Sequence, residues 1–65
     1  MFYEHFKEAC EQKKRSPSAV VLDAGMSKAN ITNWKAGQEP TLDTIVRLAA
    51  QLGISPRELV PESLN

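Results

Sequence analysis

The sequence predicts an all-α fold, a compact bundle of five short helices. Three observations favour it: apolar residues recur at spacings of three and four, every glycine and three of the four prolines lie beside a plausible helix end, and no segment alternates well enough for a β-strand. The 65 residues form one domain at most. Its stability should be modest, roughly 5 kcal/mol. We assign the domain to residues 1–60 and expect 61–65 to be a tail or the start of a linker.

The first helix is expected from Phe2 to about Lys14. Phe6, Ala9 and Cys10 continue the spacing of Phe2, so these residues form one apolar face. A single cysteine cannot form an internal disulfide, so apolar packing must hold the core together. Cations favour the C-terminal end of a helix, and this helix closes with three of them: Lys13, Lys14 and Arg15.

The second and third helices each have recognisable ends. Ser16 can cap the second helix, Pro17 suits its first position, and Gly25 ends it. Ser27 can cap the third helix, which should run to about residue 36, with Gly37 in the left-handed conformation. The buried faces of the two helices are expected to contain Val20, Val21, Ala24, Ile31 and Trp34.

The fourth helix should be the structural centre of the bundle, because it carries the longest apolar stripe. It begins at Thr41 and stops at Gly53. Residues 55–58 form a capping box with proline at the first helical position, which predicts a short fifth helix ending at Pro61. The stripe of the fourth helix consists of Leu42, Ile45, Val46, Leu48, Ala49 and Leu52.

The second and third helices are joined by a short turn with a glycine, which is the signature of a helix-turn-helix. At about 100° per residue, one arc of the third helix faces away from Ile31 and Trp34. Its lysine, hydroxyl, amide and small apolar side chains are the groups that read base edges in a major groove. The alternative is an ordinary solvated helix surface. The arc consists of Lys28, Ala29, Thr32, Asn33 and Ala36.

The stretches SPSAVVLDAGMSKANITNWKAG and TLDTIVRLAAQLGIS resemble the Cro-type helix-turn-helix domain of phage repressors, also called the xenobiotic-response-element family, over about residues 6 to 60. The resemblance implies a lambda-repressor-like bundle of five helices that binds operator DNA, commonly as a symmetric dimer. Pro17 departs from the family, because many members have there a glutamine that holds a phosphate. At the positions that match the family's base-reading residues, the resemblance implies base contacts by Lys28, Ala29, Thr32 and Asn33.

The phosphate contacts are expected around the same helix. Helix N-termini suit phosphates, and the resemblance adds the loop that follows the third helix. Net charge is zero, but between Ala24 and Gln38 there are two lysines and no acid. The cations at residues 13–15 fit a solvated helix end better than a DNA-binding patch. The phosphate-contacting candidates are Ser27, Asn30, Lys35, Gly37 and Gln38.

Other classes of function have little support in the sequence. His5 and Cys10 are five residues apart on one helix, so they do not form a metal site, and no cofactor is expected. A bundle this small has no room for a shielded substrate pocket, so we expect no enzyme and no small-molecule substrate. The start of the chain lacks the pattern of a signal peptide and no apolar run is long enough for a membrane span, which predicts a protein of the bacterial cytoplasm.

The favoured interpretation is a phage-type transcriptional regulator, a repressor, that binds a palindromic double-stranded DNA operator as a homodimer. The alternative is a protein-interaction module on the same scaffold, of the antitoxin or anti-repressor type, which zero net charge leaves open. For the dimer, the expected contact surface is the apolar cluster near Pro61, made of Leu59, Val60 and Leu64.

Overall fold

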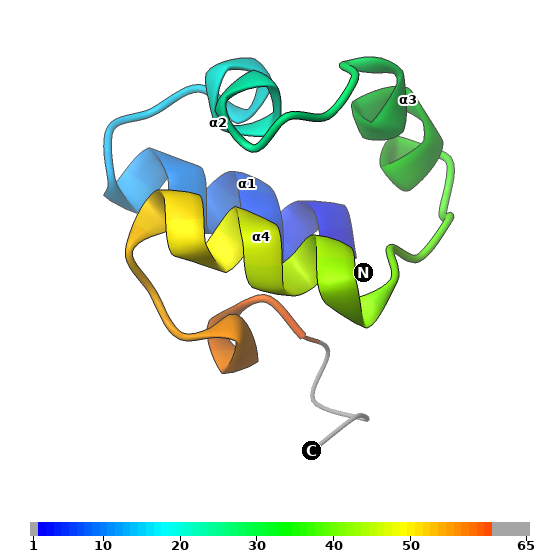
Figure 1. The fold of residues 1–65 in the computed structure, drawn as a ribbon. Coiled ribbons are helices and arrows are strands. Elements are labelled where there is room, and N and C mark those ends of the chain that lie inside the picture. Colours follow the sequence, from blue (N-terminus) through cyan, green and yellow to red (C-terminus); the bar gives the residue numbers. More distant parts are fainter. Residues whose placement is uncertain (1, 61–65) are drawn as a thin grey trace.

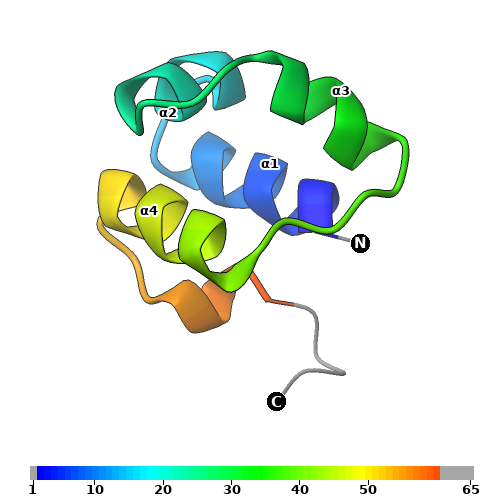
Figure 2. The same cartoon turned by 45° about the vertical axis from the view of Figure 1, so that its right-hand side comes forward.

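The computed structural model describes residues 2–60, which form four α-helices and one turn of 3-10 helix. In Figures 1 and 2, α2 and α3 lie above α1, and η1 lies below α4. The second helix packs on both α1 and α4, α3 packs chiefly on α1, and η1 packs on α4. The described residues contain no β-strand. The elements are α1 (Phe2–Gln12), α2 (Pro17–Asp23), α3 (Ala29–Lys35), α4 (Leu42–Leu52) and η1 (Pro56–Glu58).

The core is a single apolar cluster to which every α-helix contributes, and Leu59 completes it from just beyond η1. Within the described residues no polar or charged side chain is buried. Three aromatic rings join α1 to α3: Phe2 and Phe6 stack at 5.8 Å, and the Trp34 ring meets both edge-on at 5.1 and 5.7 Å. Such edge-to-face pairs add specific geometry to apolar burial, so they fix how α3 lies on α1.

The helix starts follow the sequence expectations closely. The Ser16 hydroxyl accepts a hydrogen bond from the Ala19 N–H with Pro17 at the first position of α2, and the Thr41 hydroxyl accepts from the Thr44 N–H at the start of α4. The capping box of Ser55 and Glu58 is also present. These caps satisfy backbone donors that have no partner inside the helix, which is why they could be recognised locally.

The end of α1 differs from the expectation. The helix stops at Gln12, and Lys14 adopts φ +57°, while the Arg15 N–H donates to the Cys10 carbonyl at 2.9 Å. This is a Schellman end with lysine in the left-handed position that usually takes glycine. The three cations therefore follow the last turn of α1 and are not part of it.

The prediction of a fifth helix is wrong: residues 2–60 form four α-helices, and residues 56–58 form only one 3-10 turn. Proline at 61 disfavours the helical conformation for Val60, and the Leu59 N–H bonds three residues back to Pro56. The turn ends there, and the Leu59 side chain is fully buried. Residues 61–65, which include the expected tail and Leu64, lie outside the described residues.

The apolar stripe expected along α4 is only partly buried. Ile45, Leu48, Ala49 and Leu52 belong to the core, whereas Leu42 is 69% and Val46 46% exposed. The stripe is wider than the surface that its packing partners α2 and η1 cover, so its outer edge remains in solvent. None of the helices in residues 2–60 is long and apolar enough to cross a membrane.

Candidate nucleic-acid interface

The turn between α2 and α3 is built from backbone hydrogen bonds around one glycine. Gly25 has φ +81°, and the Met26 N–H donates to the Val21 carbonyl at 3.0 Å. A Cβ at Gly25 would meet no atom within 4 Å, so the backbone conformation and not space requires glycine here. Met26 is half-buried against the core. The turn is therefore anchored at its middle, and α3 starts from a fixed point.

The start of α3 differs from the expected Ser27 cap: the N-cap residue is Lys28, which makes no side-chain cap hydrogen bond, and Ser27 lies one position before it. The Ser27 hydroxyl accepts from the Ala29 N–H at 3.1 Å, and Lys28, the N-cap residue, already has a helical backbone conformation. The Asn30 side-chain amide donates to the Ser27 carbonyl at 3.0 Å. Ser27 and Asn30 thus brace the turn, which leaves the hydroxyl proton of Ser27 available to donate outward.

Two buried residues hold α3 to the bundle. Ile31 and Trp34 are 9% and 3% exposed, and Trp34 packs against the aromatic rings of α1. The helix has seven residues, which at 1.5 Å per residue gives a rod about 10 Å long. The opposite side of the helix lies in solvent, and all four base-reading candidates are exposed there: Lys28, Ala29, Thr32 and Asn33.

The loop after α3 offers fewer phosphate donors than expected. The Gly37 N–H donates to the Trp34 carbonyl and the Gln38 N–H to the Asn33 carbonyl, both at 3.0 Å. These two backbone donors close the helix, so a phosphate would have to be held by the exposed Gln38 side chain. Lys35 is exposed as well, with its ammonium 5.4 Å from the centre of the Tyr3 ring.

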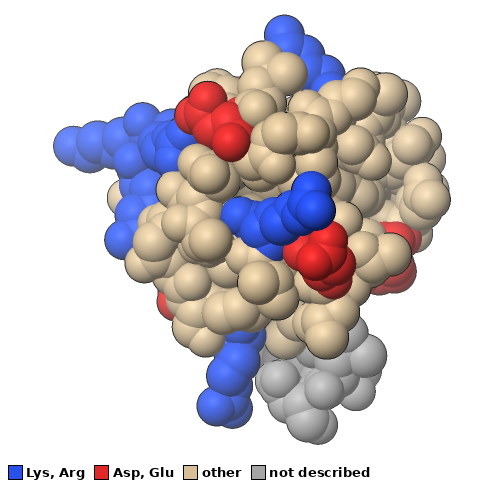
Figure 3. Space-filling view, viewed as in Figure 1, with Lys and Arg blue, Asp and Glu red and all other residues tan. Residues whose placement is uncertain are grey.

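Sequence reasoning missed the role of Arg15, which it grouped with the neighbouring lysines. The Arg15 guanidinium pairs with the Asp23 carboxylate and donates to the Gln51 carbonyl at 2.7 Å. It therefore links the last residue of α2 to the C-terminal end of α4. No local pattern relates residues 15 and 51, so the sequence held no signal for this contact. Lys13 and Lys14 remain exposed, and Figure 3 shows cationic side chains gathered on the side where α1 passes into α2.

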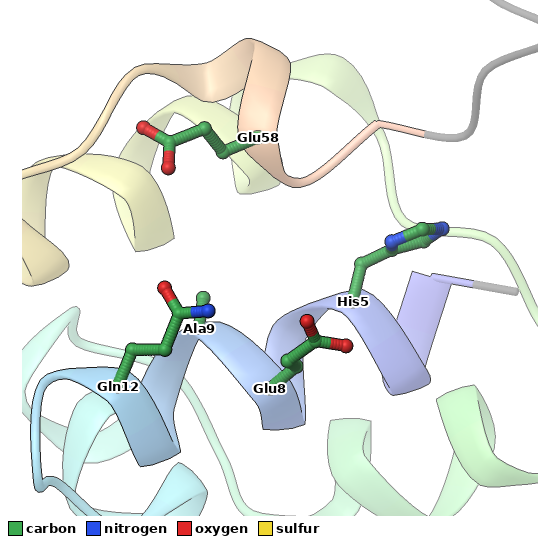
Figure 4. A pocket seen from close by; sticks show the side chains of 5 residues that line it. All are labelled: His5, Glu8, Ala9, Gln12 and Glu58. Carbon is green, nitrogen blue, oxygen red and sulfur yellow. The ribbon is translucent and has the colours of Figure 1, made fainter.

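An open hollow of about 230 Å³ lies between α1 and η1, away from α2 and α3. Figure 4 shows Glu8 and His5 on the α1 side and Glu58 across from them. One Glu58 oxygen already accepts a hydrogen bond from the Ser55 N–H. Within residues 2–60, no three His, Cys, Asp or Glu side chains come together as metal ligands. The hollow is lined by His5, Glu8, Ala9, Gln12 and Glu58.

Cys10 does not line this hollow, because its side chain is fully buried in the core. Burial raises the pKa of the Cys10 thiol to about 11. The thiol therefore stays protonated at neutral pH, and a protonated, buried thiol is a poor nucleophile and a poor metal ligand. His5 is half-buried at the surface of α1, so the two residues do not form a joint site.

Comparison with known proteins supports the geometry of α2, the turn and α3. A helix-turn-helix family model matches residues 6–59, which is well over half of the chain. No curated protein and no solved structure matched the sequence. The matched segment begins within α1 and ends at Leu59, so it contains the turn and all of α3. The chain belongs to the Cro/C1-type helix-turn-helix family, whose members are DNA-binding transcription regulators.

Proposed function

We propose that this protein is a sequence-specific operator-binding domain of a phage-type transcriptional repressor, and that α3 enters the major groove. The observation that carries the proposal is the division of α3 into two sides. Ile31 and Trp34 are buried against the bundle, while the base-reading candidates at 28, 29, 32 and 33 are exposed. This exposed ridge belongs to an α-helix, which is about 10–12 Å across with its side chains and so matches a major groove about 12 Å wide.

Each base-reading candidate has a defined chemistry. The Lys28 ammonium donates to the acceptors of guanine, and the Asn33 amide can donate to and accept from adenine at once. Ala29 and the Thr32 methyl group offer apolar contact to the methyl group of thymine. The two alanines of the exposed side, Ala29 and Ala36, keep the ridge narrow.

The phosphate contacts are assigned to groups that flank the ridge. Ser27 and Asn30 lie at its start, where the Ser27 hydroxyl still has a proton to donate. Lys35 and Gln38 lie at its end, next to Gly37. Because a monomer has few cations to place on phosphates, about 3–5, its affinity should fall with salt at a shallow slope of about −3 to −4.5 on a log–log scale. Two subunits on a palindromic operator would supply the remaining affinity.

The proposal is tested by selecting binding sites from a random DNA pool and measuring affinity for the selected site. Lys28→Ala and Asn33→Ala should each weaken binding by roughly 5–150-fold, equivalent to 1–3 kcal/mol, and relax preference at particular base pairs. Lys13→Ala removes an exposed lysine far along the chain from α3 and is the matched control for charge. If both α3 variants bound the selected site as the parent does, α3 would not be the reading helix.

A second function has one observation in its favour, the exposed apolar side chains of α4. On this alternative the chain is an antitoxin-like or anti-repressor-like partner of another protein. Gel retardation with random and genomic fragments at two salt concentrations separates the two. Retardation that depends on sequence and weakens with salt supports the operator-binding domain, whereas no retardation at low salt supports the protein partner.

A further inference from the structure

The outer edge of α4 is an apolar row that the monomer leaves in solvent. Leu42 and Val46 are 69% and 46% exposed, and Ala50, which is also exposed, follows at the same spacing of four. Residues four apart are neighbours on a helix surface. These three residues, called the α4 patch below, therefore form one continuous strip along the full length of the helix.

A charged pair runs beside the α4 patch. Asp43 and Arg47 are each one residue beyond a member of the patch, and their side chains lie 3.2 Å apart in an i,i+4 ion pair. They are the only charged residues of α4. In the view of Figure 3, one acidic and one cationic side chain lie next to each other in front of α4, among uncharged side chains. Both side chains are more than half exposed, so they are available to a partner.

The order of these charges makes the surface complementary to itself. In a two-fold interface, residue i of one subunit meets residue j of the other, and j meets i. If two α4 helices pack antiparallel along the patch, the flanking rows run in opposite directions. Asp43 then faces Arg47 of the partner subunit, and Arg47 faces the partner subunit's Asp43. The same arrangement brings the two apolar strips together.

We propose that a second copy of this chain docks on the α4 patch, with the two α4 helices antiparallel. Of the dimer surface expected from the sequence, Leu59 is fully buried and Val60 packs against the core of its own subunit, while Leu64 lies outside the described residues. This interface rests on the proposed function in one respect: an operator-binding domain needs two subunits on one palindromic site. Its test is carried out without DNA, so a failure to bind operators does not affect the result.

The experiment measures self-association by sedimentation equilibrium at protein concentrations up to about 1 mM, a range that detects weak dimers. The parent chain should show a concentration-dependent dimer. In the proposed dimer, position 43 of each subunit faces position 47 of the other. Asp43→Arg therefore brings two pairs of positive charges together, and Arg47→Asp brings two pairs of negative charges together. Each variant alone should therefore self-associate about tenfold more weakly. Circular dichroism spectra should show that each variant keeps its helices.

The decisive measurement is the equimolar mixture of the two charge variants. One variant carries arginine at both 43 and 47 and the other carries aspartate at both, so the mixture should form a heterodimer about as strong as the parent dimer. The double variant with both substitutions should also recover self-association. A merely structural effect of either substitution would persist in the mixture. Two weakly associating variants that stay apart when mixed would overturn the antiparallel arrangement.

Two variants that each replace an exposed leucine with serine give an independent check. Leu42→Ser removes the most exposed apolar side chain of the α4 patch and should weaken self-association about tenfold or more, because both subunits lose it. Leu22→Ser is the matched control, because Leu22 is 52% exposed but belongs to α2. A parent chain that stays monomeric up to about 1 mM, or equal effects of the two serine variants, would rule out the second copy as the partner of this face.

Discussion

Replacing Arg15 with alanine tests whether one side chain holds the helix-turn-helix to the rest of the bundle. The Arg15–Asp23 pair leaves 31% and 57% of the two side chains exposed, which places it in the solvent-screened range of about 0.2–1 kcal/mol. The bond to the Gln51 carbonyl is charge-assisted and satisfies an acceptor at the end of α4 that lacks a partner within the helix. We assign it about 1 kcal/mol, below the usual charged-bond range because the donor is partly exposed. Arg15→Ala should therefore lower the free energy of unfolding by about 1.5 kcal/mol.

The assay is urea unfolding followed by tryptophan fluorescence, which reports on Trp34 directly. A double-mutant cycle with Asp23→Ala isolates the ion pair, which should couple by less than about 1 kcal/mol and fade at about 1 M salt. The rest of the effect belongs to the Gln51 bond and should persist in salt. Lys13→Ala is the control and should change stability by no more than about 0.5 kcal/mol. An Arg15→Ala variant as stable as its parent would refute the assigned role.

Three further predictions concern the backbone and the core. Lys14→Gly should stabilise the fold by about 0.5–1 kcal/mol in urea unfolding, because Lys14 holds a left-handed conformation (φ +57°) that glycine adopts without strain. Gly25→Ala should cost about 1–2 kcal/mol in the same assay, although its Cβ meets no neighbour; an unchanged midpoint would contradict the strain argument. Burial raises the pKa of the Cys10 thiol, so the protonated thiol stabilises the folded state. This stabilisation is complete below the ordinary pKa of 9.0 and is lost as pH rises through about 11. Unfolding measured between those pH values should show a decrease of about 2–3 kcal/mol that Cys10→Ala lacks.

The features that were predicted correctly from the sequence are those determined by a few neighbouring residues. The caps at Ser16 and Thr41 and the turn at Gly25 each need only a local hydrogen bond or a local backbone conformation. The buried faces of α2 and α3 followed from spacing in the same way. The exposed positions of the base-reading candidates are consistent with the helical wheel, while their contacts with DNA remain a prediction.

The features that were missed depend on distant parts of the chain. Arg15 finds its acceptor 36 residues away, and no spacing rule connects the two positions. The burial of Leu42 and Val46 was overestimated because an apolar stripe shows which side of a helix faces the core but not how much of that side the neighbouring elements cover. The length of the fifth helix was overestimated. A capping box shows where a helix can start, whereas Pro61 determined how soon this one had to end.

Zero net charge is compatible with DNA binding because the charges are not mixed evenly over this bundle. Arg15 and Arg47 are each paired with an aspartate, so they contribute little field beyond their own surroundings. Two glutamates line the hollow between α1 and η1, away from α3. On α3, by contrast, the sequence from Ala24 to Gln38 contains two lysines and no acid. Interactions between exposed charges fade beyond about 8 Å at physiological salt, so a phosphate near α3 responds to those lysines and not to the sum over the molecule. With only two lysines in that segment, non-specific attraction to DNA is limited, which under the proposed function leaves base contacts a larger share of the binding energy.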